Sequence, residues 1–280
     1  MLTTPVVSAA DVVPTRVRLV DARNGPDSAA AFVRSHLAGA VRADLATDLC
    51  ATSADASHGG RHPLPPLTDW AARLGRWGIR PEVDVVVYDD LGGVNSAARC
   101  WWMLRAAGHG RVAILDGGLQ AALAAGWPVE SGPARVWPDG PYPVSGWGGP
   151  TKDIAGVEGA LADRDQVVVD VRAAERYRGE SEPIDPVAGH IPGAVSWPLT
   201  DTLAGGHFKS PAELRALFAE RLGDACADQL TVHCGSGVTA CHTLAALEYA
   251  GLPGAALYVG SWSEWCRTDR PRATGSTAQP

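Results

Sequence analysis

Residues 230–240 read Leu-Thr-Val-His-Cys-Gly-Ser-Gly-Val-Thr-Ala, and this stretch decides how the chain is interpreted. A short apolar run ends at Cys234, a Gly-Ser-Gly turn follows, and apolar residues at helical spacing continue toward Gly251. The pattern predicts a strand, a tight loop and a helix, with one thiol at the strand end. Loop N–H groups and the positive end of the helix dipole would favour the thiolate there. The setting therefore indicates nucleophilic cysteine catalysis.

The chain contains one pattern twice. Residues 17–23 read Val-Arg-Leu-Val-Asp-Ala-Arg and residues 35–41 read Ser-His-Leu-Ala-Gly-Ala-Val; residues 167–172 (Val-Val-Val-Asp-Val-Arg) and 189–195 (Gly-His-Ile-Pro-Gly-Ala-Val) repeat both. Each copy continues into an apolar strand, a helix that ends at glycine, and another strand. Strands that alternate with helices predict an α/β fold, in which each copy forms a mostly parallel sheet with helices on both faces.

The repeat also predicts the domain boundaries. Residues 133–149 are rich in Pro and Gly and lack periodicity, which is typical of a linker. We expect an N-terminal domain at residues 1–132 and a C-terminal domain at residues 150–280, the latter ending in a frayed tail from residue 274.

The two copies differ at the position of the thiol. When they are aligned on the Gly-Val pair that follows the loop, Cys234 falls on Asp90, or on Asp89 if one residue is added. A carboxylate cannot carry a transferable sulfur. The N-terminal domain is therefore expected to be non-catalytic and the C-terminal domain catalytic.

Composition narrows the class of protein. The chain has 280 residues, 46% hydrophobic and 20% charged, with a formal net charge of −7. This charge argues against nucleic acid as a partner, and no apolar run approaches the ~18 residues that span a membrane. The N-terminus does not look like a signal peptide, and the six cysteines have no regular spacing. We expect reduced thiols in a cytoplasmic protein, with no metal site and no cofactor.

Taken together, these features resemble the two-domain rhodanese-type sulfurtransferases. The resemblance rests on the tandem repeat, the loop cysteine in the second copy with aspartate in the first, residues 190–195, and Gly-Ser-Trp at residues 260–262. The loop Cys-Gly-Ser-Gly-Val-Thr-Ala resembles the 3-mercaptopyruvate branch. Thiosulfate-specific members typically carry basic residues directly after the cysteine, where this chain has Gly235 and Ser236.

The resemblance assigns roles to particular residues. Cys234 matches the nucleophile that forms a persulfide, and Ser236 matches a loop serine implicated in proton transfer. His62 matches a histidine that faces this serine, and Arg176 matches the arginine that grips the substrate carboxylate. The remaining candidates for substrate binding are loop residues Gly235, Gly237, Val238 and Thr239.

Two positions depart from the family pattern. Some mercaptopyruvate enzymes have a second substrate arginine about nine residues after the first, whereas residues 182–185 here read Glu-Pro-Ile-Asp. The acid that supports the histidine would fall on Ala46, with Asp44 and Asp48 nearby as substitutes.

The function implied is transfer of sulfur from 3-mercaptopyruvate, through a Cys234 persulfide, to a thiol such as thioredoxin or a low-molecular-weight thiol, or to cyanide, with release of pyruvate. A thiosulfate sulfurtransferase is the rival enzyme, and a sulfur-sensing or protein-binding module is the non-enzymatic alternative. A rhodanese-like phosphatase needs arginine six positions after the cysteine, and Ala240 stands there.

Several other residues are interpreted as structural. The Asp-X-Arg motifs at Asp21 and Asp170, and the histidines His36 and His190, occur in both copies. Arg178 is expected at the surface and Cys241 in the core. The ten tryptophans are expected in core and interdomain packing, with Trp262 and Trp265 as alternative candidates for a wall of the site.

Overall fold

The computed structural model describes residues 2–223 and 225–276, and the chain divides into two compact units. Unit 1 comprises residues 1–51, 65–149 and 205–208, and unit 2 comprises residues 52–64, 150–204 and 209–280. Residues 52–64 therefore precede most of unit 1 in sequence but belong to unit 2. The end of the expected frayed tail, residues 277–280, lies outside the described residues. In the described part of the chain, no helix is both long enough and apolar enough to span a bilayer.

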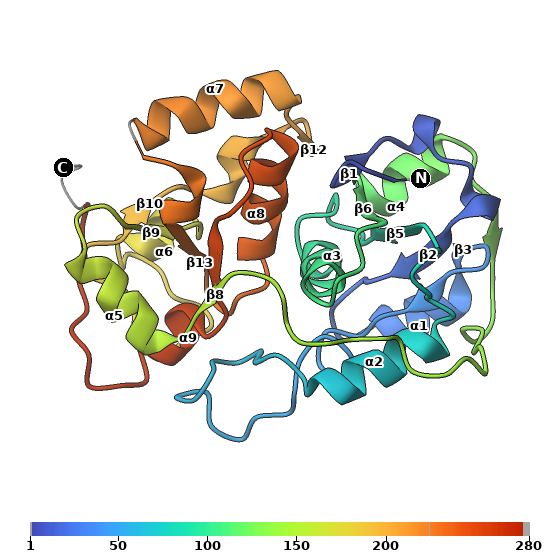
Figure 1. Cartoon of the computed structure of the whole chain (residues 1–280), viewed down its shortest axis with the longest axis horizontal. Coiled ribbons are helices and arrows are strands. Elements are labelled where there is room, and N and C mark those ends of the chain that lie inside the picture. The colour runs from blue at the N-terminus through green and yellow to red at the C-terminus, as the bar shows by residue number, and fades with distance from the viewer. Residues whose placement is uncertain (1, 224, 277–280) are drawn as a thin grey trace. The chain divides into compact units, whose positions relative to one another are not determined.

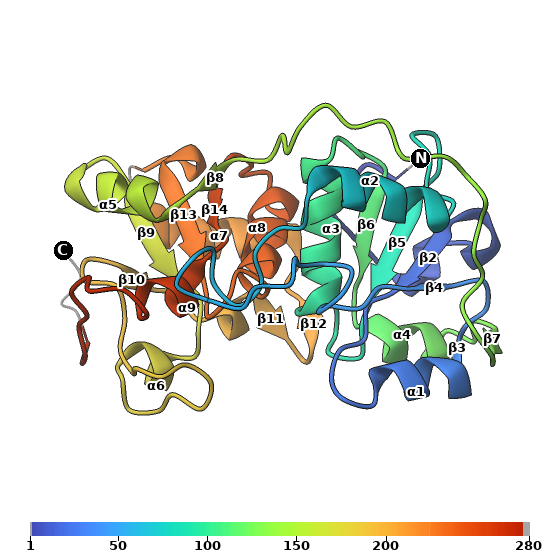
Figure 2. The ribbon, with the colours of Figure 1, turned by 90° about the horizontal axis from the view of Figure 1, so that it is seen from below.

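Unit 1 is built on a five-stranded parallel sheet in the order β1-β6-β5-β2-β4. Helices α2 and α3 lie on one side of this sheet and α1 and α4 on the other (Figure 2). The strands are β1 (Val6–Val7), β2 (Arg18–Asp21), β3 (His36–Leu37), β4 (Val41–Arg42), β5 (Val85–Tyr88), β6 (Val112–Leu115), β7 (Val129–Glu130) and β12 (His207–Phe208). The helices are α1 (Ser28–Arg34), α2 (Leu67–Arg76), α3 (Ser96–Ala106) and α4 (Gly118–Ala124), with 3-10 turns at Ala9–Asp11 and Pro14–Arg16.

Unit 2 repeats the arrangement with the sheet order β10-β9-β13-β14-β8 (Figure 1). All four pairings in this sheet are parallel. Its strands are β8 (Thr151–Lys152), β9 (Val167–Asp170), β10 (Val195–Ser196), β11 (Leu203–Ala204), β13 (Leu230–His233) and β14 (Ala256–Tyr258). Its helices are α5 (Ile154–Ala162), α6 (Ala174–Tyr177), α7 (Pro211–Leu222), α8 (Ala240–Tyr249) and α9 (Ser261–Trp265), with 3-10 turns at Leu199–Thr202 and Ala227–Gln229.

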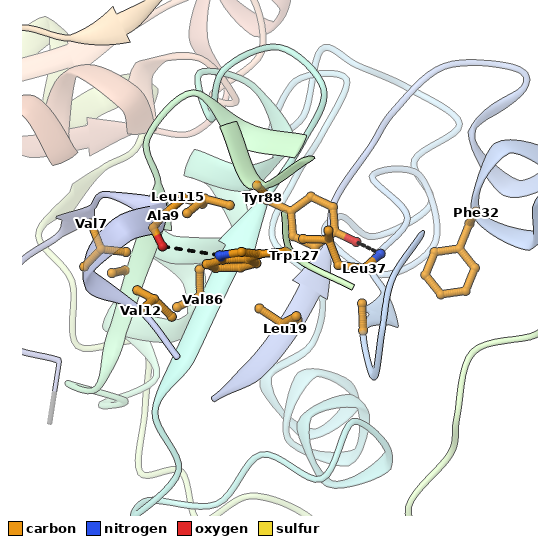
Figure 3. Packing of buried hydrophobic residues seen from close by; sticks show 13 residues of the cluster. Val7, Ala9, Val12, Leu19, Phe32, Leu37, Val86, Tyr88, Leu115 and Trp127 are labelled. Carbon is orange, nitrogen blue, oxygen red and sulfur yellow. Dashed lines mark hydrogen bonds between the residues drawn. The ribbon is translucent and has the colours of Figure 1, made fainter. Parts of the chain in front are cut away.

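The central strands of both sheets are buried on both faces, as their runs of Val, Leu and Ile predict. In unit 1, Trp127 lies in the middle of one core layer and donates from its indole nitrogen to the carbonyl of Ala9 at 3.3 Å (Figure 3). In the same layer, the hydroxyl of Tyr88 accepts the backbone N–H of Leu37 at 3.2 Å. Buried polar atoms thus find partners inside the apolar layer.

In unit 2, α5 and α9 share one core cluster that contains Val157, Tyr258, Trp262 and Trp265. The two tryptophans are buried, and each indole nitrogen donates to a backbone carbonyl, that of Val187 or of Pro271, at 2.9 Å. They thus pack in the core next to α5, which agrees with the core packing expected of the tryptophans.

The shared Asp-X-Arg motifs are structural in both units, as predicted. In each, the aspartate accepts the arginine's own backbone N–H at 3.0 Å and pairs with its guanidinium. The shared histidines are also structural: the ring of His36 stacks on Phe32 and that of His190 on Tyr177, both with ring centroids 3.8 Å apart.

Strand register identifies the residue of unit 1 that corresponds to Cys234. Asp21 of β2 pairs with Tyr88, and Asp170 of β9 pairs with His233. The next residues, Asp89 and Cys234, are therefore equivalent, and of the two alignments that the sequence left open the structure selects Asp89.

The carboxylate of Asp89 occupies a ring of backbone N–H groups. Oδ1 accepts from Leu91 at 2.9 Å and Gly93 at 2.7 Å, and Oδ2 accepts from Asn95 at 3.1 Å and Ala97 at 3.2 Å. Burial raises the pKa of this carboxyl group, and the four N–H groups act in the opposite direction. The loop of unit 1 is thus an anion cradle filled by its own side chain.

We expect Asp89→Ala to destabilise unit 1, because it leaves four N–H groups in and around a buried loop without their acceptor. The loss should be on the order of 3 kcal/mol, measured as a lower midpoint of urea unfolding. Asp90→Ala, which removes the same group from an exposed neighbour, is the matched control and should leave the midpoint unchanged. Equal midpoints for the two variants would contradict the structural role of the cradle.

Candidate active site

Cys234 lies at the carboxyl end of β13, which is flanked in its sheet by β9 and β14. Its backbone N–H donates to the hydroxyl of Ser261 at 3.2 Å, and its carbonyl accepts from the N–H of Trp262 at 3.1 Å. The carbonyl of Gly235 accepts from the N–H of Ser263 at 2.9 Å. The Gly-Ser-Trp segment therefore fixes the backbone on both sides of the thiol. Ser261 has φ of 55°, the left-handed region that non-glycine residues seldom adopt.

The loop after Cys234 needs its glycines. Gly237 has φ of 70°, and a Cβ placed there would collide with the carbonyl of Val259. Within residues 2–223 and 225–276, the backbone N–H groups of Gly235, Ser236 and Thr239 donate to no other group of the protein. They lead into α8, whose positive dipole end faces the loop. The corresponding loop of unit 1 binds the Asp89 carboxylate through its backbone N–H groups, so this loop is suited to bind an anion.

His62 reaches the loop because residues 52–64 are held against unit 2. The N–H of Gly59 donates to a carboxylate oxygen of Glu264 at 2.8 Å, and the N–H of Arg61 donates to the hydroxyl of Ser263 at 3.1 Å. Nδ1 of His62 then lies 2.9 Å from Oγ of Ser236. The structure thus brings together Cys234, Ser236 and His62.

The two acids considered as supports for His62 make other contacts. Asp44 pairs with Arg42 and accepts the N–H groups of Ala46 and Thr47. Asp48 accepts the N–H of Asp44 at 2.8 Å and pairs with Arg73 at 2.6 Å. Both carboxylates stabilise the local fold of unit 1.

Arg176 extends from α6 toward the same loop. A Cβ built on Gly235 would lie 3.4 Å from one terminal nitrogen of its guanidinium and 3.5 Å from the other. The guanidinium is held from behind by Glu182, whose two oxygens lie 2.7 and 2.9 Å from Nη2. Burial alone would raise the pKa of Glu182, but the hydrogen bonds from Arg176 and from backbone N–H groups outweigh it and hold that pKa below its ordinary value.

A second guanidinium, which sequence reasoning missed, reaches the same place. Nη2 of Arg61 lies 3.3 Å from the Cβ position of Gly235. Its Nε pairs with Oδ1 of the buried Asp185 at 3.1 Å, and Arg267 pairs with the same oxygen at 2.8 Å. Asp185 thus stands where the family resemblance would have a second substrate arginine, and its carboxylate holds two arginines from elsewhere in the chain. The signal in the sequence was the adjacent pair Arg61-His62.

Other groups near the thiol have structural or electrostatic roles. Burial opposes the charge of Arg172, yet the carboxylates of Asp170 and Glu182 raise its pKa overall, and the nearby Cys234 position acts in the same direction. Cys241 is buried in α8 and its thiol faces the carbonyl of Gly237, which agrees with packing. Arg178 pairs with Glu180 at the surface, as expected. In the described part of the chain, no cluster of His, Cys, Asp and Glu side chains is arranged to hold a metal ion.

The sequence matches the family described as the rhodanese-like domain over residues 9–125 and again over residues 155–268. The chain therefore belongs to the rhodanese family and carries its domain twice, which confirms both the resemblance and the tandem α/β fold.

Three similar proteins refine the comparison. The chain is 45% identical to a probable 3-mercaptopyruvate sulfurtransferase of Pseudomonas aeruginosa over 250 residues, 87% of this chain and 86% of that protein. It is 41% identical to a putative thiosulfate sulfurtransferase of Mycobacterium tuberculosis over 271 residues, 92% and 90% of the two chains. Among solved structures, it resembles 3-mercaptopyruvate sulfurtransferase from Leishmania major with a TM-score of 0.79 and 29% identity, covering 94% of this chain and 74% of that one.

The ion pair between Glu182 and Arg176 predicts a pH dependence of stability. Because the pKa of Glu182 is lowered in the folded state, its stabilising effect is complete above the ordinary pKa of about 4.3 and is lost as pH falls below it. Glu182→Gln should cost about 1–3 kcal/mol at pH 7, and its urea midpoint should approach that of the wild type only as pH falls toward the lowered folded-state pKa of Glu182. Glu180→Gln, which removes an exposed partner of Arg178, should show neither effect. A deficit for Glu182→Gln that stayed constant with pH would contradict this ionisation.

Proposed function

We propose that this chain is a sulfurtransferase that takes sulfur from 3-mercaptopyruvate and carries it as a persulfide on Cys234. The observation that carries the proposal is the meeting of three elements at one strand end: a thiol next to the backbone N–H groups of its loop, the Ser236–His62 pair, and an arginine held over Gly235. The similarity to enzymes named 3-mercaptopyruvate sulfurtransferase supports the same reaction.

In the first half-reaction, the Cys234 thiolate attacks the sulfur of mercaptopyruvate. An S–S bond forms, the C–S bond breaks, and its electron pair passes to the carbon as pyruvate enolate. The proton of the substrate thiol returns to this carbon through Ser236, with His62 as its hydrogen-bond partner. The products are pyruvate and an anionic persulfide on the enzyme.

The loop of unit 2 stabilises the persulfide anion. In unit 1, the equivalent loop surrounds the Asp89 carboxylate with four N–H donors. The outer sulfur of a persulfide lies two bonds beyond Cβ, as a carboxylate oxygen of Asp does, so it can accept hydrogen bonds from the N–H groups of Gly235, Ser236 and Thr239. Gly237 and Val238 complete the loop and set its curvature.

In the second half-reaction, an acceptor removes the outer sulfur. A thiolate, on thioredoxin or a low-molecular-weight thiol, or cyanide attacks that sulfur, and the S–S electron pair returns to Cys234. Donor and acceptor react in turn with one thiol, which gives ping-pong kinetics.

A carboxylate distinguishes mercaptopyruvate from thiosulfate, and we assign Arg176 to bind it with two parallel N–H···O bonds. A thiosulfate sulfurtransferase is the second candidate, because the guanidinium groups near Gly235 would also attract a dianion, and one close relative bears that name. We assign the N-terminal unit, with Asp89 in place of the thiol, a non-catalytic role.

We expect Cys234→Ser to abolish pyruvate release from mercaptopyruvate, whereas Cys241→Ser, the nearby buried thiol in α8, should retain it. The measurement is kcat/KM for pyruvate formation with a thiol acceptor, compared with thiocyanate formation from thiosulfate and cyanide. Mercaptopyruvate should be the better donor by at least about tenfold, because each charged hydrogen bond to its carboxylate contributes about 1.5–3 kcal/mol. A higher kcat/KM with thiosulfate would reject the assigned substrate.

A double-mutant cycle tests the pair formed by His62 and Ser236. His62→Asn and Ser236→Ala should each lower kcat for mercaptopyruvate by about 10²-fold or more, within the range of general acid–base groups. Together they should lower it by little more than one alone, because both variants interrupt one proton path. Effects that multiply would show that the two residues act independently.

A further inference from the structure

We propose that Arg61 is a specificity-determining residue that binds the α-keto carboxylate together with Arg176. The inference rests on the proposed function and extends it to a residue that neither the sequence motifs nor the comparisons assign. The guanidinium groups of Arg61 and Arg176 meet at one point of the loop. Nitrogens of both lie within 3.3–3.5 Å of the Cβ position of Gly235.

The position of Gly235 makes this meeting relevant to substrate. Gly235 follows the nucleophile directly, and its carbonyl is fixed by the N–H of Ser263. A Cβ at this position would already touch both guanidinium groups, and a longer side chain would fill the space that the glycine leaves between the loop and the two arginines. An anion that reaches the thiol therefore meets both cations.

Each arginine is held by a carboxylate that lies deeper than itself. The side chain of Asp185 is 0% exposed and that of Glu182 is 3% exposed, whereas Arg61 and Arg176 are 24% and 18% exposed. The carboxylates thus bind the inner edges of the guanidinium groups and leave outer N–H groups for a ligand. Because each guanidinium has five N–H donors in a planar fork, it can bind both partners at once.

The charge balance of this cluster favours an anion. Four arginines, Arg61, Arg172, Arg176 and Arg267, surround three carboxylates, those of Asp170, Glu182 and Asp185. The cluster therefore carries one excess positive charge next to the thiol, in a chain whose formal net charge is −7. Local cations are what a monoanionic keto acid needs, since the overall field repels it.

Arg267 provides a matched control. It pairs with the same oxygen of Asp185 as Arg61 does, and its side chain is exposed to the same extent, 24%. Its other contacts are the carbonyl of Ser263 and the thiol of Cys266, and it is not among the atoms nearest the Cβ position of Gly235. Removing Arg267 thus takes the same charge from the same carboxylate without removing a guanidinium from the loop.

The test compares Arg61→Gln, Arg61→Lys and Arg267→Gln. Arg61→Gln should raise KM for mercaptopyruvate roughly 10- to 100-fold, with a much smaller change in kcat, because a charged hydrogen bond to the substrate is lost in both the ground and transition states. Arg61→Lys should recover part of this loss, since it keeps the charge without the fork. Arg267→Gln should change KM far less than Arg61→Gln.

A binding measurement separates this proposal from the reaction itself. Calorimetric titration of Cys234→Ser protein with pyruvate reports the keto-acid site without turnover, and the same titration on Cys234→Ser/Arg61→Gln should show affinity weakened by a similar factor. Unchanged pyruvate affinity, or an equal effect of Arg267→Gln, would overturn the role of Arg61. A wild-type enzyme that releases no pyruvate from mercaptopyruvate would instead refute the proposed function, while the titration would still decide whether Arg61 binds a keto acid.

Discussion

The central constraint in this molecule is the convergence of backbone N–H groups at the carboxyl end of a buried parallel strand. Such a loop cannot remain empty of negative charge without leaving buried donors unpaired. The two units meet this demand in different ways. Unit 1 fills its loop permanently with the Asp89 carboxylate, and unit 2 places Cys234 at the equivalent position, where the negative charge can arrive as a thiolate or a persulfide. The same loop geometry therefore stabilises the fold in unit 1 and forms the proposed reaction site in unit 2.

The surroundings of Cys234 act together on this constraint. The Gly-Ser-Trp segment fixes the backbone of the thiol, and residues 52–64 bring Arg61 and His62 to the loop through their contacts with Glu264 and Ser263. Buried carboxylates then orient the arginines rather than compete with substrate for them. A proposed anion site therefore contains acidic residues because Glu182 and Asp185 bind the buried edges of the guanidinium groups and fix their orientation.

The sequence predicted the parts of the site that depend on local pattern. The strand, the glycine loop and the helix around Cys234 follow from residues that are neighbours in the chain, and so does the structural role of Asp21 and Asp170. The equivalence of Asp89 with Cys234 stayed ambiguous because the two loops have different lengths, and only strand register resolves it. The contact between Arg61 and Asp185 joins residues 124 positions apart, which no local pattern encodes. Trp262 and Trp265 lie in the core cluster that α9 shares with α5, as the sequence suggested for the tryptophans in general.

The most direct test of the account is the mass of the intact protein after incubation with 3-mercaptopyruvate in the absence of an acceptor. The account predicts an increase equal to one sulfur atom, located by peptide mapping on Cys234, released by cyanide and absent from Cys234→Ser. No increase, or sulfur bound to another cysteine, would contradict the central claim that the loop of unit 2 stabilises an anionic persulfide.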